Sequence, residues 1–552
     1  MAFEVLLDQV GSLGRFQILQ LAFFFISIVL LYPRILLENF TAAIPDHRCW
    51  VHILDNDTVS NNDTGTLGQD ALLRVSIPLD SNLRPEKCRR FVHPQWQLLY
   101  PNESFSNMSE LDTEPCVDGW VYDRSFFFST IVTEWDLVCE SQLQKSVAQF
   151  LLMAGSLLGG LVYGYLADRF GRKIICRCCL LQLAISDTCA AFAPNFFIYC
   201  SLCFLAGFCI MSLLGNLYVL AVEWTNPQSR SMTLILLSSA YSVGQMVLGG
   251  LAFAIRDWRT LKLTLSIPVF VFFLSSRWMV ESARWLIINH QLDEGLKELR
   301  RVAHINGKMV SGEILTTEFL SSTMQEELDR AQIKASVSFL FHAPKLRMRV
   351  LYLSFVSLMT IVPYYGLILN VEHLGRNVYL FQVLFGAVTL IGRFFALWTL
   401  NHMGRRLSQM LLMFLVGLSI LVNTFLSQEM QMLRVALGTL GAGTLSAALT
   451  SFGVHSCELI PTIVRSTVGG ISIVFSRIGA ALSPLLMILM RYSPHLPWIT
   501  YGVFPIVAGL IVLLLPETRN LPLPNTIEDV ENDRKETRNV EQEDTYMKIT
   551  QF

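Results

Sequence analysis

The sequence predicts an all-α membrane protein with twelve transmembrane helices, arranged as two six-helix repeats. Three observations lead to this prediction: the composition, the spacing of the apolar runs, and a set of short motifs that occurs twice. Of the 552 residues, 52% are hydrophobic and 16% are charged, whereas about 25% of residues are charged in an ordinary soluble domain. The net charge of −2 gives no basis for a nucleic-acid partner.

Apolar runs near the length that crosses a bilayer, about 20 residues, recur along the chain. Six predicted spans form a first half, 16–280, and lie near 16–37, 146–166, 174–193, 196–221, 231–254 and 260–280. Six more form a second half, 348–515, and lie near 348–370, 378–400, 408–426, 432–454, 467–490 and 497–515. A charged linker, 281–347, separates the halves, and short termini, 1–15 and 516–552, flank them. The first span follows acidic residues and is too long for a cleavable signal peptide, so we expect it to stay in the membrane.

The segment 38–145, between the first two spans, is expected on the extracellular side. It contains five predicted glycan acceptors, Asn39, Asn56, Asn62, Asn102 and Asn107, and four cysteines, Cys49, Cys88, Cys116 and Cys139. Glycans and disulfides both belong to that side of a membrane. Asn39 is the poorest acceptor because it lies next to the first span. The four cysteines allow three pairings, and the sequence does not choose among them.

Basic residues gather in the loops on the other side. They follow spans 2, 4, 8 and 10 as Arg169, Arg172, Lys173, Arg177, Arg230, Arg405, Arg406 and Arg465, and nine more lie in 281–347. The excess of lysine and arginine in cytoplasmic loops makes the linker and both termini cytoplasmic.

Three loop motifs occur once in each half. GYLADRFGRK (164–173) matches LNHMGRR (400–406), EWTNPQSR matches ELIPTIVR, and VESARWL matches PETRNLP. The shifts are 233 residues from Gly171 to Gly404, 235 from Glu223 to Glu458, and 236 from Glu281 to Glu517. One basic loop is common in any membrane protein, but acidic partners at a nearly constant shift indicate an internal repeat with a midplane site between its halves.

The repeated motifs also predict charge pairs at the cytoplasmic helix ends. The expected gating residues are Asp168, Arg172, Glu223, Arg230, Glu458 and Arg465. Arginine makes paired hydrogen bonds to carboxylates. We expect such pairs, each worth about 0.5–2 kcal/mol, to close this side and to break when it opens. Asn401 replaces the acidic residue in the second copy, which leaves that copy with one anion fewer.

Together these motifs resemble the major facilitator superfamily. The long first loop, with its sequons and four cysteines, resembles solute carrier family 22. MAFEVLLDQVGSLGRFQ, LENFTAAIP, EPCVDGWVYDRS and TEWDLVC are similar to its organic anion transporter branch. The resemblance covers essentially the whole chain and implies the twelve-helix fold of that superfamily. Cys203 departs from the pattern, since relatives commonly carry arginine there.

Arg393 and Arg477 are the main candidates for binding a substrate. Each lies inside a predicted span, where an arginine costs about 2.5–3.5 kcal/mol at the bilayer centre, and spans 7–12 offer no obvious carboxylate partner. Guanidinium groups suit carboxylate and sulfate anions. The alternative is that either arginine snorkels or caps backbone carbonyls. The resemblance supports an anion site, because these positions match cationic residues associated with anion handling, and cation-carrying relatives tend to place aspartate at the position of Arg477.

Aromatic residues are expected to form the rest of the pocket. The resemblance matches Tyr364, Tyr365 and Tyr241 to cavity-lining aromatics, and Phe452 is a weaker candidate. A tyrosine offers a flat apolar face and a hydroxyl, which suit an amphipathic ligand, although plain helix packing is as common an explanation for a single tyrosine. Arg34 is interpreted as an outer-interface residue and Asp187 as a helix-to-helix contact. Cysteines 176, 178 and 179 are interpreted as packing residues, so no metal site is expected.

The sequence thus predicts a plasma-membrane secondary transporter of amphipathic organic anions, such as steroid sulfates, glucuronides and bile-acid-like conjugates. It contains no phosphate-binding loop for ATP and no set of catalytic groups, so neither an enzyme nor a cofactor is predicted. Exchange with a dicarboxylate is what the resemblance implies. The alternatives are an organic cation or zwitterion carrier on the same fold, and a substrate-sensing receptor without transport. The acidic tail is predicted to be disordered, and its ending, Thr550-Gln-Phe, suggests a PDZ-domain partner.

Overall fold

A computed structural model of the chain describes residues 2–11, 14–55, 68–80, 84–99, 112–308, 316–332, 343–374, 377–427, 429–461, 464–519, 524 and 526–531. The chain divides into two compact units. One consists of Met1–Asn39, Ser146–Ala254 and Lys262–Phe552, and the other of Phe40–Lys145 and Ile255–Leu261. Within the described ranges, eleven helices are long and apolar enough to cross a membrane, and a shorter apolar helix, Leu496–Val512, follows them. The all-α transmembrane fold is therefore confirmed.

Six spans belong to the first half. The first is nearly continuous from Arg15 to Thr41 and consists of α2 (Arg15–Leu31), α3 (Pro33–Leu36) and α4 (Glu38–Thr41). The others are α8 (Leu143–Phe170), α9 (Arg172–Ala191), α10 (Phe196–Glu223), α11 (Pro227–Ala254) and α12 (Trp258–Ser275).

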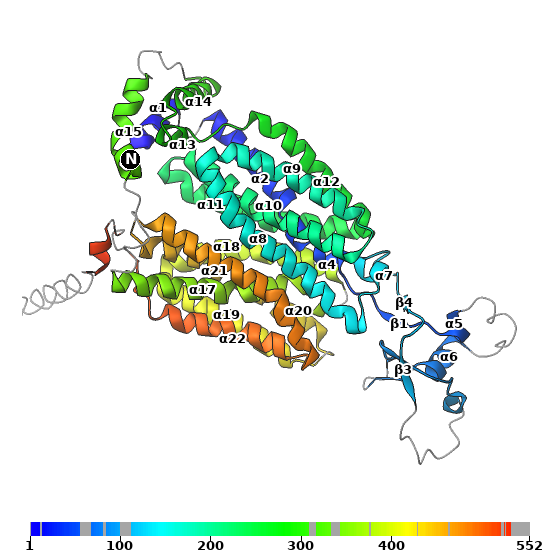
Figure 1. The fold of residues 1–552 in the computed structure, drawn as a ribbon. Coiled ribbons are helices and arrows are strands. Elements are labelled where there is room, and N and C mark those ends of the chain that lie inside the picture. The colour runs from blue at the N-terminus through cyan, green and yellow to red at the C-terminus, as the bar shows by residue number, and fades with distance from the viewer. Residues whose placement is uncertain are drawn as a thin grey trace, which may run out of the picture. The chain divides into compact units, whose positions relative to one another are not determined.

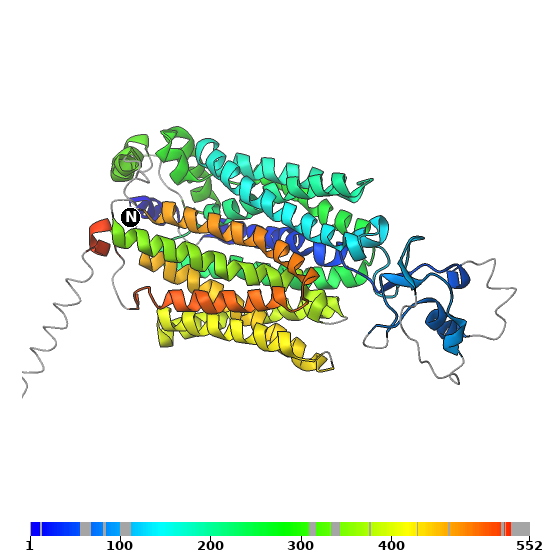
Figure 2. The ribbon, with the colours of Figure 1, turned by 60° about the horizontal axis from the view of Figure 1, so that its bottom comes forward.

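Six spans belong to the second half, namely α17 (Pro344–Leu369), α18 (Val378–Met403), α19 (Arg405–Phe425), α20 (Gln431–Leu459), α21 (Arg465–Leu486) and α22 (Leu496–Val512). Figures 1 and 2 show these helices as one group beside α8–α12. Below, the basic side means the helix ends next to the loops rich in arginine, and the opposite side means the other ends of the same helices.

Small residues let the helices pack with their backbones in contact. A Cβ atom on Gly159 of α8 would lie 1.8 Å from the carbonyl oxygen of Phe208 in α10. A Cβ on Gly392 of α18 would lie 2.2 Å from the carbonyl oxygen of Gly443 in α20. These two glycines are 233 residues apart, which is the shift of the first loop motif. The repeat predicted from the loops therefore extends into the packing of the spans, where small residues permit close approach.

Four shorter helices, α1 (Ala2–Val10), α13 (Ala283–Ile288), α14 (Leu292–Ile305) and α15 (Thr317–Gln332), gather at the basic side (Figures 1 and 2). Asn306, just after α14, ties the N-terminal helix to the linker. Its Oδ1 accepts a hydrogen bond from the Phe16 backbone at 2.9 Å, and its Nδ2 donates to the Val10 carbonyl at 3.1 Å. The N-terminal segment and the linker thus form a small helical layer of their own.

Part of the C-terminal tail is also ordered, contrary to the prediction. Residues 527–531 are helical, and the Val530 side chain is buried in an apolar cluster with Leu346 and Leu459. The Glu531 carboxylate accepts hydrogen bonds from the Lys345 and Leu346 backbone N–H groups at 2.9 and 3.1 Å, at the start of α17. A carboxylate at this position satisfies N–H groups that have no partner inside the helix. Thr550 and the predicted PDZ-binding end lie outside the described residues.

The second unit contains two small antiparallel sheets. Strand β1 (His47–Cys49) pairs with β4 (Trp120–Tyr122), and β2 (Arg89–Phe91) pairs with β3 (Thr113–Pro115). The short helices α5 (His52–Asp55), α6 (Gln69–Ser76) and α7 (Ile131–Trp135) lie between and after these strands in the chain. All four cysteines are paired in the structure, in one of the three possible combinations, Cys49–Cys116 with Cys88–Cys139.

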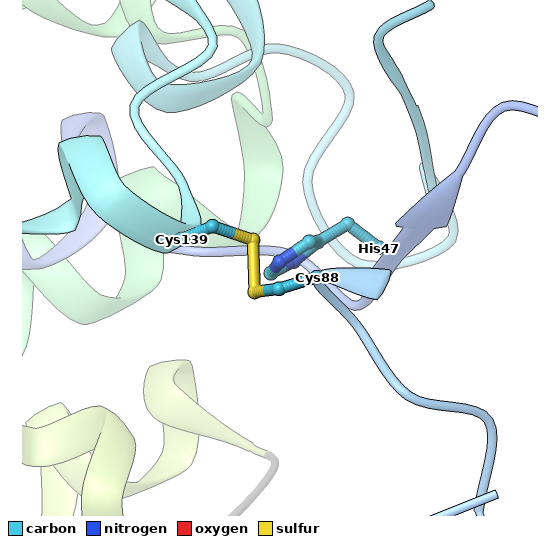
Figure 3. Close-up of side chains that lie close together, drawn as sticks. All are labelled: His47, Cys88 and Cys139. Carbon is cyan, nitrogen blue, oxygen red and sulfur yellow. A yellow bond between two sulfur atoms is a disulfide. The ribbon is translucent and has the colours of Figure 1, made fainter. Parts of the chain in front are cut away.

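The His47 ring lies beside the second disulfide, as Figure 3 shows. Three such side chains would resemble a metal site if both sulfurs were thiolates. Cys88 and Cys139 are bonded to each other, so their sulfurs are not available as thiolate ligands. This group is therefore a structural feature of the loop unit.

Candidate functional site

Five tyrosines from four spans meet where the two halves face each other. The hydroxyl groups of Tyr32, at the end of α2, and Tyr364, in α17, are 2.9 Å apart. The Tyr241 ring of α11 lies between two others, with its centroid 4.6 Å from that of Tyr32 and 5.8 Å from that of Tyr218 in α10. The Tyr364 and Tyr365 rings meet edge to face at 5.4 Å. We call these five residues the tyrosine cluster.

Arg393 of α18 reaches the tyrosine cluster from the second half. Its guanidinium carbon lies 5.7 Å from the centroid of the Tyr241 ring, within the range of a cation–π contact. Its Nη1 donates a hydrogen bond to the Ser238 carbonyl in α11. Its Nε is buried and has no hydrogen-bond partner among the described residues. The alternative interpretation of the sequence is that this arginine caps a backbone carbonyl. The structure shows such a contact for Nη1, but Nε does not take part in it.

Arg477 of α21 lies on the same cluster, close enough to Tyr365 and Tyr241 for electrostatic interaction. Both arginines are partly exposed. Within the described ranges, neither forms an ion pair with a carboxylate. The site therefore combines two positive charges with flat aromatic faces and hydroxyl groups. This combination suits a ligand with an anionic group on a large apolar body.

The structure brings together five of the six residues predicted for the pocket. Phe452 is the exception, because it packs against two apolar clusters of the second half, one of which includes Val356 and Leu412. We therefore assign Phe452 to the core of the second half. Tyr32 and Tyr218 are members of the cluster that the sequence did not reveal. Each is one aromatic residue in a long apolar run, and such a residue cannot be told from a packing residue without the helix rotation.

At the basic side, an arginine in each half binds a glutamate in the last turn of the fourth span of that half. In the first half, Arg172 Nη1 lies 2.9 Å from Glu223 Oε1. Asp168 is 4.0 Å from Arg172, and its side chain is 82% exposed. In the second half, Arg405 binds Glu458 through Nε and Nη2, at 2.9 and 3.0 Å.

Arg230 and Arg465 have other partners than predicted. Each donates to a backbone carbonyl five residues earlier, Arg230 to Thr225 at 3.3 Å and Arg465 to Ile460 at 3.2 Å. They therefore hold the turns that start α11 and α21. The charge pairs described above join helices inside one half, so these contacts do not support the prediction that they close one side of the molecule.

Two glutamates that were recognised only as repeat markers also have a role. Glu281 accepts hydrogen bonds from the Arg172 and Lys173 backbone N–H groups at 3.2 and 2.9 Å. Glu517 accepts from the Arg405 and Arg406 N–H groups at 2.9 and 3.0 Å. Each carboxylate thus caps the N-terminus of the third span of its half, where N–H groups are otherwise unpaired.

Arg34 is not an interface residue. It is buried, and its Nε lies 2.5 Å from Asp187 Oδ2 in α9, while its Nη2 donates to the Leu265 carbonyl in α12. Asp187 joins neighbouring helices as predicted. This pair differs from Arg393 and Arg477 because its positive charge is matched by a carboxylate inside the protein.

Asn39 does not have the surroundings of a glycan acceptor. Its side chain is 3% exposed, and its Nδ2 donates to the Ile368 carbonyl at 2.6 Å and to Gln382 Oε1 at 3.4 Å. A glycan needs an accessible amide, so the prediction is wrong for Asn39 in this conformation. The other four predicted acceptors, Asn56, Asn62, Asn102 and Asn107, lie outside the described residues.

Comparison with known proteins agrees with this architecture. A family model described as Major Facilitator Superfamily matches residues 123–484. The inward-open structure of the xylose transporter XylE from E. coli aligns with a TM-score of 0.58 at 16% identity, over 74% of this chain and 92% of that chain, which shows the fold alone. Two six-helix repeats with a polar site between them thus define a transporter of the major facilitator superfamily, and not an enzyme.

Full-length relatives narrow the class. The chain is 73% identical to the steroid transmembrane transporter SLC22A24 of Microcebus murinus and 69% identical to that of Homo sapiens, over 100% of each chain. It is 61% identical to human solute carrier family 22 member 10, over 97% of this chain and 99% of that protein. The chain belongs to solute carrier family 22.

Proposed function

We propose that this chain carries amphipathic organic anions, such as steroid sulfates, steroid glucuronides and bile-acid-like conjugates, across the plasma membrane. The main support is the pair Arg393 and Arg477, two arginines at membrane depth beside aromatic rings and without a carboxylate partner among the described residues. An ionisable group at that depth marks a functional site by default. The names of the most similar relatives, which describe them as steroid transporters, favour the same substrate class.

The residues have separate roles in this proposal. The two guanidinium groups bind the sulfate or carboxylate of the substrate and lose their mutual repulsion when it is present. The rings of the tyrosine cluster pack against the apolar body, and the hydroxyls of Tyr32 and Tyr364 bind its polar substituents. Because both halves contribute to the site, a rocking movement exposes it to either side in turn. The basic side, with both termini, is cytoplasmic in this proposal, following the positive-inside rule, and a dicarboxylate is the proposed exchange partner.

The alternative carrier of organic cations has less support. A cation would meet two positive charges, and the described part of the site contains no carboxylate to bind it. A receptor without turnover would keep the binding site but would not accumulate its ligand.

The test is uptake of labelled estrone sulfate and of a labelled steroid glucuronide by cells expressing the protein, with and without preloaded glutarate. We expect uptake by the wild type, stimulation by glutarate, and at least a tenfold loss in Arg477→Asp at equal surface abundance. Arg477→Lys keeps the charge without the paired hydrogen bonds, and we expect an intermediate rate. Uptake of an organic cation with none of the anions would refute the proposal.

A further inference from the structure

Asn39 joins the two halves on the opposite side. It lies in α4, at the end of the first span, and its amide donates to Ile368 and Gln382 of the second half. All three residues are nearly inaccessible, at 3%, 1% and 0% exposure. The contact therefore forms part of a closed surface between the halves.

The Ile368 carbonyl lies at a helix end, where it requires a hydrogen-bond donor from outside the helix. Ile368 lies one residue before the end of α17 at Leu369, and the last four carbonyls of a helix lack a partner inside it. In the closed arrangement, water cannot reach Ile368, so Asn39 satisfies its carbonyl. When the halves separate, water replaces the amide at little cost. The contact is thus suited to form and break.

The first half holds Asn39 in place through the preceding residue. Glu38 is buried, and its Oε1 accepts a hydrogen bond from the Tyr199 hydroxyl at 2.7 Å. Lys262 supplies the positive charge, with Nζ 3.4 Å from the Tyr199 hydroxyl, 4.5 Å from the centre of its ring and 3.8 Å from Cys203 Sγ. A lysine from α12 therefore provides a cation beside Cys203.

We propose that Asn39 is the gate residue of the opposite side, and that it acts through its free amide and carries no glycan. The anchored turn of Glu38 presents the amide to the end of α17, which closes the route from this side to the tyrosine cluster. The proposal rests on the proposed function, since a gate is needed only if a substrate passes. In this proposal, Asn39 takes part in the conformational change of the protein and is not a glycosylation site.

The test distinguishes the effect of losing the Asn39 amide from the effect of losing the glycosylation sequon. Asn39→Ala removes both, Thr41→Val removes the sequon and the buried Thr41 hydroxyl but keeps the Asn39 amide, and Gln382→Ala removes one partner and keeps the sequon. Each variant is combined with Ser242→Cys, a reporter buried between the halves that contacts Thr389 at 3.0 Å. The readout is the rate at which a membrane-impermeant thiol reagent, added outside intact cells, labels the reporter, with variants lacking Ser242→Cys as the background.

We expect Asn39→Ala to label at least threefold faster than the wild type and to lose uptake, because the opposite side is open more of the time. Gln382→Ala is expected to change in the same direction by less, and Thr41→Val to behave like the wild type. Wild-type labelling rates in both Asn39→Ala and Gln382→Ala would overturn the gate, and an equal loss in Asn39→Ala and Thr41→Val would assign the effect to the sequon.

Peptide mass spectrometry of the surface protein after deglycosylation in heavy water supplies an independent measurement. An unmodified Asn39 is expected, and a glycan found there would also overturn the proposal. Failure of the proposed function looks different. In that case the wild type takes up no anion, while Asn39→Ala still changes the labelling of the reporter.

Discussion

The two halves share one architecture, but they treat the arginines inside their spans in opposite ways. In the first half, Arg34 is paired with Asp187, with side-chain exposures of 4% and 7%. In the second half, Arg393 and Arg477 lie against tyrosines and a backbone carbonyl, without a carboxylate among the described residues. The first half is therefore close to electrically balanced inside, and the second half supplies the net positive charge of the site.

This difference explains why a sequence repeat does not give a symmetric function. The glycines after the second span of each half, Gly171 and Gly404, have φ angles of +95° and +88°, which favour glycine. The capping glutamates and the arginine–glutamate pairs also coincide in the two halves. These shared devices hold the helix ends in both halves, whereas the residues facing the midplane have diverged. In the proposed function, selectivity therefore depends on positions that the repeat does not preserve.

The largest expected effect comes from breaking the balanced pair of the first half. Asp187→Asn leaves Arg34 buried without a counter-ion, and removing one partner of a buried pair costs about 3–5 kcal/mol. We expect a large drop in the melting temperature of the purified protein in detergent and a loss of surface abundance. The double variant Arg34→Leu with Asp187→Leu removes both charges and should lose less than Asp187→Asn. Equal losses would mean that charge balance is not what this pair contributes.

A smaller effect is expected where the halves share a charge pair but differ in its geometry. Glu458 receives hydrogen bonds from Nε and Nη2 of Arg405 and from the Thr518 hydroxyl at 2.6 Å. Arg172 Nη1, in contrast, lies 2.9 Å from Glu223 Oε1 without the geometry of a hydrogen bond. Glu458→Gln should destabilise the protein by about 1–3 kcal/mol, and Glu223→Gln by less. The melting temperatures of the two variants, compared with the wild type at one pH, measure the difference. The reverse order would show that the number of contacts does not set the strength of these pairs.

The spans, the repeat, the cysteine-rich loop and the two arginines of the site could be predicted from the sequence because they depend on composition and spacing. The partners of Arg230, the place of Tyr218 and the contacts of Asn39 could not. In a membrane span, lipid and protein interior are both apolar, so hydrophobic periodicity does not show which face of a helix points inward. Contacts that depend on helix rotation therefore require the structure.

The capping glutamates should contribute similar stability in both halves, and the contribution of Glu517 should depend on pH. Partial burial acts to raise the pKa of Glu517, but four backbone N–H donors outweigh it and hold the pKa below its ordinary value near 4.5. The stabilisation from this group is fully present above the ordinary value and is lost as pH falls through the lowered one. Glu517→Ala should cost about 0.5–2 kcal/mol near neutral pH, measured as a lower melting temperature, and the difference from the wild type should shrink in acid.

Glu281→Ala is the matched variant of the first half, and a similar cost is expected because Glu281 caps α9 in the same way. A pH-independent cost in Glu517→Ala would show that packing, and not the ionised carboxylate, is lost. A cost confined to one half would show that the two caps are not equivalent.

The smallest effect should come from the position where the loop motifs differ most clearly in charge. Asp168 is 82% exposed and 4.0 Å from Arg172, and exposed ion pairs contribute about 0–1 kcal/mol. Asp168→Asn makes the first copy resemble the second, which has Asn401. It should therefore leave the melting temperature almost unchanged and should keep uptake near the wild-type rate. Asn401→Asp is the reverse change and should be equally mild. If Asp168→Asn abolished uptake at normal stability, Asp168 would act in a conformation other than the one described, and the first half would contain a charge switch that the second half has lost.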